Sequence, residues 1–253
     1  MVPSTPSFRL DGRRAIVTGA GRGIGYACAC ALAHGGAAVT LVARSSEEIE
    51  ASARAIRESG AIAEAAALDV TDLSAVHTFF EKRPAYDILV NNAGTNRPMG
   101  IIDVSEEDYD AVLGLNLKSA FFVAQAVARK MIAAQRRGCL IHMSSQMGHV
   151  GGKSRSLYCA SKWGLEGLNK ALALDLAPHG IRSNTIAPTY VETPLTVPYF
   201  KDAEFLKSTL GKIKLGRLGQ PQDIMGAVLF LASDAAALLT GSSIVIDGGW
   251  TAD

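Results

Sequence analysis

The sequence predicts an α/β protein with a doubly wound, mostly parallel sheet of seven strands and helices on both faces. Short apolar runs alternate with longer helical patterns along all 253 residues, and a glycine-rich turn directly follows the first run. Hydrophobic residues make up 48% of the chain, which is enough to bury both faces of a parallel sheet. Ligands bind such sheets at the carboxyl ends of the strands, so functional residues are expected there.

The apolar runs place the strands one after another along the chain. They are expected near residues 14–18, 38–43, 62–68, 87–91, 139–144, 181–187 and 243–247. Residues 1–8 read as a flexible lead-in, and residues 190–216 are long enough to form a small helical lid over a substrate. No linker or repeat divides the chain, so we expect one domain spanning residues 1–253.

The turn after the first strand has the composition of a phosphate-binding loop. Its residues are Thr18, Gly19, Ala20, Gly21, Arg22, Gly23, Ile24 and Gly25. Glycines allow positive φ angles and let a pyrophosphate approach the N-terminus of the next helix, where free N–H groups favour negative charge. Ile24 stands where the usual G-x-G-x-x-G has its third glycine, so the spacing that fits is Gly19-x-x-x-Gly23-x-Gly25. A merely structural tight turn is the alternative.

The end of the second strand bears on the choice of nucleotide. NAD-binding folds place an Asp or Glu here for the ribose hydroxyls, whereas this chain has Ala43 followed by Arg44. A guanidinium pairs bidentately with a 2′-phosphate, so NADP(H) is expected over NAD(H), with help from Arg22 and the hydroxyls of Ser45 and Ser46. The alternative is that Arg44 is an ordinary exposed loop charge.

Tyr158 and Lys162 are four residues apart in a predicted helix and therefore lie on one face. A nearby ammonium favours the phenolate, so Lys162 could lower the pKa of Tyr158 and make it a proton carrier at neutral pH. Such a pair also occurs by chance on solvated helices, so the interpretation depends on the other motifs.

Taken together, these motifs resemble the short-chain dehydrogenase/reductase family over nearly the whole chain. The remaining matches are Asn91-Asn92-Ala93-Gly94 after the fourth strand, then Asn116 and Ser145. The resemblance implies a Rossmann-type fold and hydride transfer between a nicotinamide and a carbonyl or secondary alcohol. It also implies roles for Ser145 in binding the carbonyl oxygen, for Lys162 at the nicotinamide ribose and for Asn116 in anchoring a water. The cofactor would further contact Asp69, Val70, Asn92, Ala93, Gly94, Pro188, Val191 and Thr193.

One position departs from the family pattern. The family most often has Pro-Gly after the sixth strand, whereas this chain has Pro188-Thr189. Threonine disfavours positive φ, so the loop beside the nicotinamide is expected to differ slightly.

Substrate identity is the least determined part of the sequence. Gln146, His149 and Tyr190 are expected to face the pocket, and Arg97 could pair with a carboxylate, as in gluconate-type relatives. Arg97 could equally be a solvated loop charge. Reduction of a 3-oxoacyl group on a carrier protein is another candidate, with docking charge from Arg129, Lys130, Arg136 and Arg137. A non-catalytic NADP-binding regulator is the rival from a different class.

Composition narrows the remaining possibilities. A net charge of +1 provides no steering field for nucleic acid, and no apolar run is expected to approach the roughly 20 residues that span a bilayer. The start lacks a secretory pattern, so the cytoplasm is expected. Four cysteines without C-x-x-C spacing suggest buried thiols and no metal. Wide apolar arcs on the helices around residues 117–132 and 157–176 favour a homo-oligomer, a tetramer or a dimer.

Overall fold

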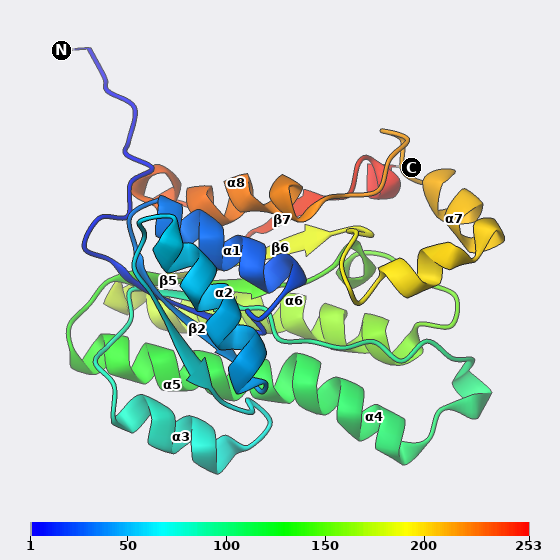
Figure 1. The fold of residues 1–253 in the computed structure, drawn as a ribbon, viewed down its shortest axis with the longest axis horizontal. Coiled ribbons are helices and arrows are strands. Elements are labelled where there is room, and N and C mark those ends of the chain that lie inside the picture. Colours follow the sequence, from blue (N-terminus) through cyan, green and yellow to red (C-terminus); the bar gives the residue numbers. More distant parts are fainter. Residues whose placement is uncertain (1, 253) are drawn as a thin grey trace.

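Seven parallel strands form one continuous sheet in the computed structural model, which describes residues 2–252 (Figure 1). The order across the sheet is β3-β2-β1-β4-β5-β6-β7. The strands are β1 (Arg14–Thr18), β2 (Ala38–Ala43), β3 (Ala63–Ala67), β4 (Ile88–Asn91), β5 (Gly138–Met143), β6 (Ile181–Pro188) and β7 (Ser243–Ile246). Each lies within one residue of its expected bounds, and every pairing is parallel, so the predicted fold class is confirmed.

Helices cover both faces of this sheet, as Figure 1 shows. The main helices are α1 (Gly23–His34), α2 (Ser46–Glu58), α3 (Leu73–Glu81), α4 (Glu106–Leu113), α5 (Ser119–Ala133), α6 (Ser156–Leu176), α7 (Ala203–Leu210) and α8 (Pro221–Ala232). Successive strand residues point to opposite faces. Val17 therefore packs in the core beneath α1, α2 and α8, whereas its neighbour Ile16 packs in the core beneath α3 and α5.

The two segments expected to be irregular differ in structure. Residues 2–8 contain no regular element, while Met1 of the predicted lead-in lies outside the described residues. Within residues 190–216 the chain forms a short 3₁₀ turn at Val197–Lys201 and then α7, which projects from the body of the molecule (Figure 1). A small helical insertion therefore follows β6, and its role as a substrate lid stays a prediction.

Residues 106–133 form one long helical run, although the sequence predicts no apolar segment long enough to span a bilayer. This run is long and apolar enough to cross a membrane by length and composition alone. Its α5 portion packs Val123, Val127 and Met131 into the core against the sheet. Burial against the protein accounts for the apolar composition, because core helices pass the same test.

The cysteines behave mostly as the composition suggested. Cys28 and Cys139 are fully buried, which raises the pKa of their thiols to about 12 and about 11. Cys30 and Cys159 are partly buried, and all four are free thiols.

Candidate active site

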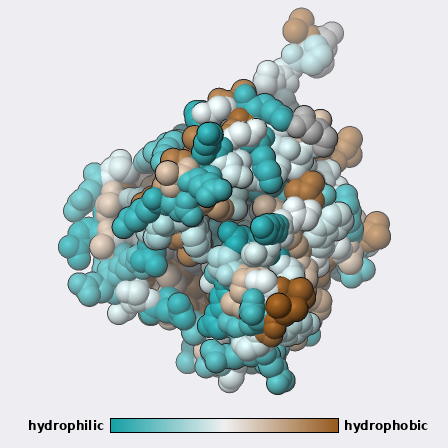
Figure 2. Space-filling model, turned by 90° about the vertical axis from the view of Figure 1, so that its right-hand side faces the viewer, coloured by the Kyte–Doolittle hydropathy of each residue, from teal (hydrophilic) through white to brown (hydrophobic). Residues whose placement is uncertain are grey.

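A cavity of about 290 Å³ opens at the carboxyl ends of the central strands. Its walls come from the glycine turn, the loops after β4 and β5, the start of α6 and the loop after β6. The predicted residues that line it are Gly19, Arg22, Gly23, Ile24, Gly25, Asn92, Ala93, Gly94, Ser145, Gln146, Tyr158, Lys162, Pro188, Tyr190, Val191 and Thr193. Figure 2 views the end of the molecule that bears α7, where hydrophilic colours predominate. The topology thus gathers residues from across the sequence into one site.

The glycine turn is held in one conformation by its neighbours. Gly19 and Gly23 have φ angles of +62° and +58°, which L side chains rarely adopt. A Cβ on Gly25 would lie 2.2 Å from the Gly19 carbonyl oxygen, so the chain approaches itself too closely for any side chain. The Asn92 amide donates to the carbonyl oxygens of Thr18 at 2.9 Å and Gly19 at 3.1 Å. The turn is therefore held in place at the N-terminus of helix α1, where free backbone N–H groups favour negative charge.

The wall beside this turn is built by Thr18 and the segment after β4. The Thr18 hydroxyl accepts hydrogen bonds from the backbone N–H groups of Asn92 at 3.0 Å and Ala93 at 3.1 Å. Below it the Asn91 side chain donates to the Ala120 carbonyl oxygen at 2.7 Å. The Asn-Asn-Ala-Gly segment thus ties the glycine turn to helix α5.

Five predicted cofactor residues lie outside the cavity lining, and these are Gly21, Arg44, Ser45, Asp69 and Val70. Arg44 is exposed directly after β2, and Ser45 caps α2 by accepting a hydrogen bond from the Glu48 N–H at 3.3 Å. The Asp69 carboxylate accepts from the Thr71 N–H at 2.9 Å, and Val70 is buried in the core.

The Arg22 guanidinium has a partner that the sequence did not suggest. It lies 3.2 Å from the Glu48 carboxylate at the start of α2. The Arg22 side chain is 67% exposed, so this ion pair is well solvated and an incoming phosphate would compete with a weak partner.

Tyr158 and Lys162 both face the cavity from the first turns of α6, as the helical spacing predicted. The Lys162 ammonium donates to the Met143 carbonyl oxygen at 2.7 Å and lies 5.5 Å from the centre of the Tyr158 ring. Burial lowers the pKa of Lys162 to about 8, against the opposing charge of Glu166. Burial also raises the pKa of Tyr158 to about 12, and the interaction of its hydroxyl with Ser145 works in the opposite direction. In this arrangement burial, and not Lys162, sets the direction of the shift in the pKa of Tyr158, and the ammonium is turned toward a backbone carbonyl.

Ser145 lies at the end of β5 within the same pocket. Its hydroxyl donates to the Gln146 side-chain oxygen at 2.9 Å and accepts from the Met147 N–H at 3.2 Å. The hydroxyl is buried and lines the same cavity as Tyr158.

Asn116 lies in a π-helical turn, Gly114–Lys118, between α4 and α5. Its side chain exchanges hydrogen bonds with the backbone of Thr95 at 2.8 and 2.9 Å and donates to the Ser161 hydroxyl at 3.0 Å. Single π turns inside helices are frequent at functional sites. The wider turn places the Asn116 side chain against Ser161, which directly precedes Lys162 in the chain.

The threonine that replaces the family's glycine is accommodated without strain. Among residues 2–252, Gln135 and Ser154 are the only non-glycine residues with a positive φ angle. Thr189 therefore does not adopt the strained positive φ. Its N–H donates to the Ile246 carbonyl oxygen at 3.0 Å, and its buried hydroxyl has no hydrogen-bond partner.

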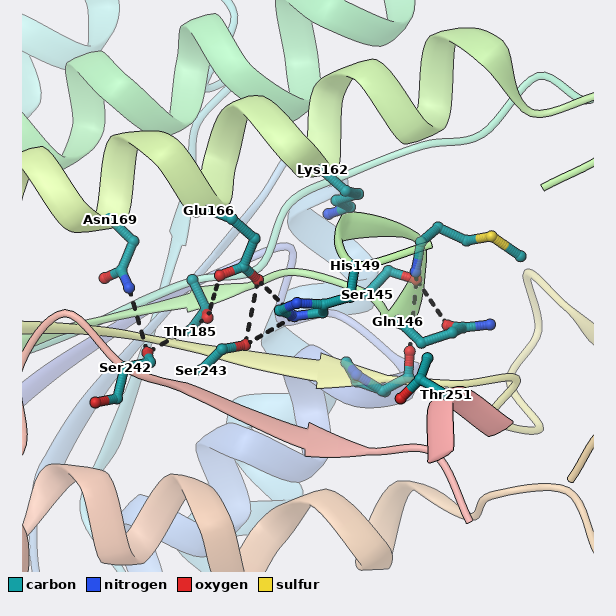
Figure 3. Close-up of polar contacts among 12 residues, drawn as sticks. Ser145, Gln146, His149, Lys162, Glu166, Asn169, Thr185, Ser242, Ser243 and Thr251 are labelled. Atoms are coloured by element: carbon teal, nitrogen blue, oxygen red, sulfur yellow. Dashed lines mark hydrogen bonds and ion pairs between the residues drawn. The ribbon is translucent and has the colours of Figure 1, made fainter. Parts of the chain in front are cut away.

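Two expected substrate residues do not face the cavity. The His149 ring points away from it, toward α6 and β7, where Nε2 lies 3.0 Å from the Ser243 hydroxyl and 3.4 Å from the Glu166 carboxylate (Figure 3). The Arg97 guanidinium lies 2.7 Å from the Asp108 carboxylate and 3.5 Å from that of Glu107, both at the start of α4. The sequence-based placement was wrong for both, because partners from α4, α6 and β7 hold these side chains.

Other cavity residues were not anticipated from the sequence. Arg155, Asn96 and Tyr199 all line the cavity, Arg155 from the residue before α6 and Tyr199 from the insertion after β6. The only sequence signal was the position of Arg155, three residues before Tyr158.

Comparison with known proteins agrees with this geometry. Residues 19–251 match the family described as enoyl-(acyl carrier protein) reductase. The chain is 36% identical to L-xylulose reductase of Bos taurus over 97% of this chain and 99% of that protein. It is 38% identical to galactitol 2-dehydrogenase of Rhizobium johnstonii over 96% and 97% of the two chains.

A solved structure shows the same fold with ligands present. The gluconate 5-dehydrogenase from Burkholderia cenocepacia, in complex with NADP and tartrate, superposes with a TM-score of 0.93 and is 38% identical, covering 97% of this chain and 98% of the other. From the shared motifs, the site and these relatives, the chain belongs to the short-chain dehydrogenase/reductase family, whose members are oxidoreductases acting on CH–OH and C=O groups.

Proposed function

We propose that this protein is an NADP(H)-dependent ketone reductase and alcohol dehydrogenase for polyhydroxy compounds. The observation that carries the proposal is the convergence of Ser145, Tyr158 and Lys162 on one cavity that the glycine turn also lines. The substrate class is supported by the relatives, whose names refer to xylulose, galactitol and gluconate.

The chemistry follows from where charge changes during the reaction. Bound NADP⁺ would take a hydride from the carbinol carbon, and NADPH would return one to a carbonyl carbon. In oxidation Tyr158 removes the hydroxyl proton, and in reduction it donates a proton to the carbonyl oxygen. The Ser145 hydroxyl donates a hydrogen bond to the same oxygen and stabilises its negative charge.

Lys162 acts on both the phenol and the cofactor ribose in this proposal. Its ammonium is within 5.5 Å of the Tyr158 ring centre, so turning from the Met143 carbonyl toward the site would bring positive charge to the phenol. Charge at that distance favours the phenolate and offsets the effect of burial. Asn116, held to Ser161 beside Lys162, would anchor the water that links this lysine to solvent.

Preference for NADP(H) is supported by the absence of an acidic residue directly after β2. Arg44 is exposed there. Arg22, in the glycine turn, forms an ion pair with Glu48 that is open to solvent. Two guanidinium groups would meet a 2′-phosphate without displacing a buried ion pair. A neighbour of known structure contains NADP.

The alternative function, reduction of a 3-oxoacyl group on a carrier protein, has less support. Two of the four basic residues expected to dock a carrier protein already have partners. Lys130 donates to the Glu81 carbonyl oxygen at 3.3 Å, and Arg136 pairs with Asp87 at 2.8 Å. We therefore favour a small-molecule substrate.

The expected setting is a cytoplasmic homo-oligomer. Phe121 on α5 and Trp163 on α6 are 42% and 53% exposed and lie on the two helices expected to form the interface. A second copy of the chain would cover both, in a dimer or a tetramer.

Substitution of the proposed proton carrier tests the function. Tyr158→Phe should lower kcat by about 10²–10⁴-fold while the dissociation constant for NADPH stays within about twofold. Nicotinamide absorbance would be followed with NADPH and NADH across ketones, diketones, keto-acids and 3-oxoesters, and in the reverse direction with polyols. Tyr109→Phe, which changes an exposed tyrosine on α4, is the matched control. Full turnover in the Tyr158 variant would refute the assignment.

A further inference from the structure

Arg155 is a buried cation with almost no partner. The residue is 9% exposed, and its guanidinium carries five donors, of which one makes a long hydrogen bond of 3.3 Å to the Ser154 carbonyl oxygen. Within residues 2–252 no carboxylate lies within ion-pair distance of it. Its other contact is the Tyr199 ring, whose centre is 5.9 Å from the guanidinium carbon. Because Arg155 lines the cavity, its remaining guanidinium donors are available to an anion bound there.

The location of Arg155 connects it with the catalytic tyrosine. It precedes α6 directly and lines the same cavity as Tyr158, three residues further on. Its positive charge acts on the phenol and lowers the pKa of Tyr158, against the larger effect of burial. An anion bound at Arg155 would therefore lie beside the reacting group.

The backbone before Arg155 adopts a rare conformation. Ser154 has a φ of +57°, in the left-handed region that few non-glycine residues occupy. Its carbonyl oxygen accepts hydrogen bonds from the Met99 N–H at 3.1 Å and from Arg155 itself. This turn leads the chain into α6 with the Arg155 side chain on the cavity side.

The charged side chains that line the cavity are all positive. Arg22, Arg155 and Lys162 line the cavity, and no Asp or Glu of the described chain does. Arg22 belongs to the glycine turn at the cofactor end, and Lys162 is satisfied by the Met143 carbonyl oxygen. Arg155 is therefore the positive charge at the tyrosine end that neither the cofactor nor the protein neutralises.

We propose that Arg155 binds a carboxylate of the substrate and that the enzyme acts on polyhydroxy acids, with aldonates preferred over neutral polyols. This rests on the oxidoreductase function proposed above and narrows its substrate class. A guanidinium holds a carboxylate through two parallel hydrogen bonds, which orients the acid as well as binding it. The anchored end would leave a secondary hydroxyl further along the chain at Tyr158 and Ser145. Arg97 does not serve this purpose, because Asp108 and Glu107 already hold it.

The test compares acids with polyols of the same carbon skeleton. Initial rates with NADP⁺ would be measured for D-gluconate against D-glucitol, D-galactonate against galactitol, and threonate against threitol, each at the pH optimum of the variant. The variants are Arg155→Gln, which removes the charge, and Arg155→Lys, which keeps the charge but loses the fork. Arg97→Gln tests the competing arginine, and Arg54→Gln removes an exposed arginine of α2 as a matched control.

The expected results separate acids from polyols. The wild-type enzyme should favour the acid in at least one pair by about tenfold or more. Arg155→Gln should lower kcat/KM for the acids by about 100-fold and that for the polyols by less than about threefold, with Arg155→Lys intermediate. Arg97→Gln and Arg54→Gln should leave both unchanged. Calorimetric titration of L-tartrate into the NADP⁺ complex should show binding that Arg155→Gln abolishes, while NADPH binding confirms that each variant is folded.

Several outcomes would overturn the proposal. These are equal rates for acids and polyols in the wild-type enzyme, equal losses for both in Arg155→Gln, loss of acid turnover in Arg97→Gln instead, or tartrate binding that is independent of Arg155. Turnover of polyols or other ketones without acids would refute the carboxylate site and leave the proposed oxidoreductase function intact. Absence of NADP-linked turnover with every carbonyl and alcohol would refute that function, and the tartrate titration would then decide the role of Arg155 separately.

Discussion

The buried histidine of β5 makes folding stability depend on pH in a way that can be calculated. His142 is completely buried, and neither ring nitrogen has a hydrogen-bond partner. Burial, reinforced by the charge of Lys162, lowers its pKa from 6.5 to about 4. Between these values the unfolded chain binds a proton that the folded chain does not. The stabilisation is therefore fully present above pH 6.5 and is lost as the pH falls toward 4.

The size of this effect follows from the shift. At about 1.4 kcal/mol per pH unit, a pKa lowered from 6.5 to about 4 corresponds to about 3 kcal/mol of unfolding free energy, most of it between pH 6.5 and 4.5. His142→Leu, an apolar replacement of similar volume, should remove this part of the pH dependence. Other titrating groups contribute equally to both proteins, so the difference between them isolates the histidine.

The assay is urea unfolding followed by circular dichroism at intervals between pH 7.5 and 4.5. The wild-type protein should lose about 2 to 3 kcal/mol more than His142→Leu over this range, because the last part of the effect falls below pH 4.5. His179→Gln, which removes an exposed imidazole, is the matched control and should keep the wild-type slope. Equal slopes for the wild-type protein and His142→Leu would show that the buried ring does not remain neutral, and the reasoning would fail.

Two further predictions concern the cofactor and the lysine. Arg44→Asp should raise KM for NADPH about tenfold or more and shift preference toward NADH, because a carboxylate repels the 2′-phosphate; an unchanged ratio of kcat/KM values would refute the contact. Glu166→Gln removes the carboxylate that raises the pKa of Lys162, so the alkaline limb of the pH–rate profile should move to lower pH. Glu58→Gln, at an exposed site, should not move it, and an unmoved limb in Glu166→Gln would exclude this influence.

The Glu166 prediction rests on a polar network that links four elements behind the active site. The carboxylate accepts hydrogen bonds from the hydroxyls of Thr185 at 2.9 Å and Ser243 at 3.3 Å and lies 3.4 Å from the His149 ring (Figure 3). It thereby connects α6, which carries Tyr158 and Lys162, to β6, β7 and the turn after Ser145. Glu166 acts through this network and is a positioning residue in the proposed reaction.

Local pattern was sufficient to predict the fold. The strands of a parallel sheet are buried on both faces, so they appear as short apolar runs whose ends the sequence marks clearly. The glycine turn was equally readable, because the positive φ at Gly19 and Gly23 and the close approach at Gly25 exclude other residues. The Tyr158–Lys162 spacing follows from helical periodicity.

The sequence did not show in the same way which polar side chains face the cavity. Arg97, Arg155 and His149 all follow or precede predicted elements near the carboxyl end of the sheet. Their roles depend on partners that other elements supply: Asp108 of α4 holds Arg97, and Glu166 of α6 and Ser243 of β7 hold His149. Within residues 2–252 no carboxylate pairs with Arg155. The contact of Lys162 with the Met143 carbonyl oxygen also depends on how α6 packs against β5.

The sequence by itself determined the strand positions of an α/β domain, the glycine turn after the first strand and the helical spacing of Tyr158 and Lys162. These features depend on backbone conformation and on periodicity, which neighbouring residues impose. Only the tertiary structure decided which cation remains free to bind an anion in the cavity and which groups are desolvated there. Charge pairing and desolvation are properties of the assembled packing, because they depend on every element that surrounds a group.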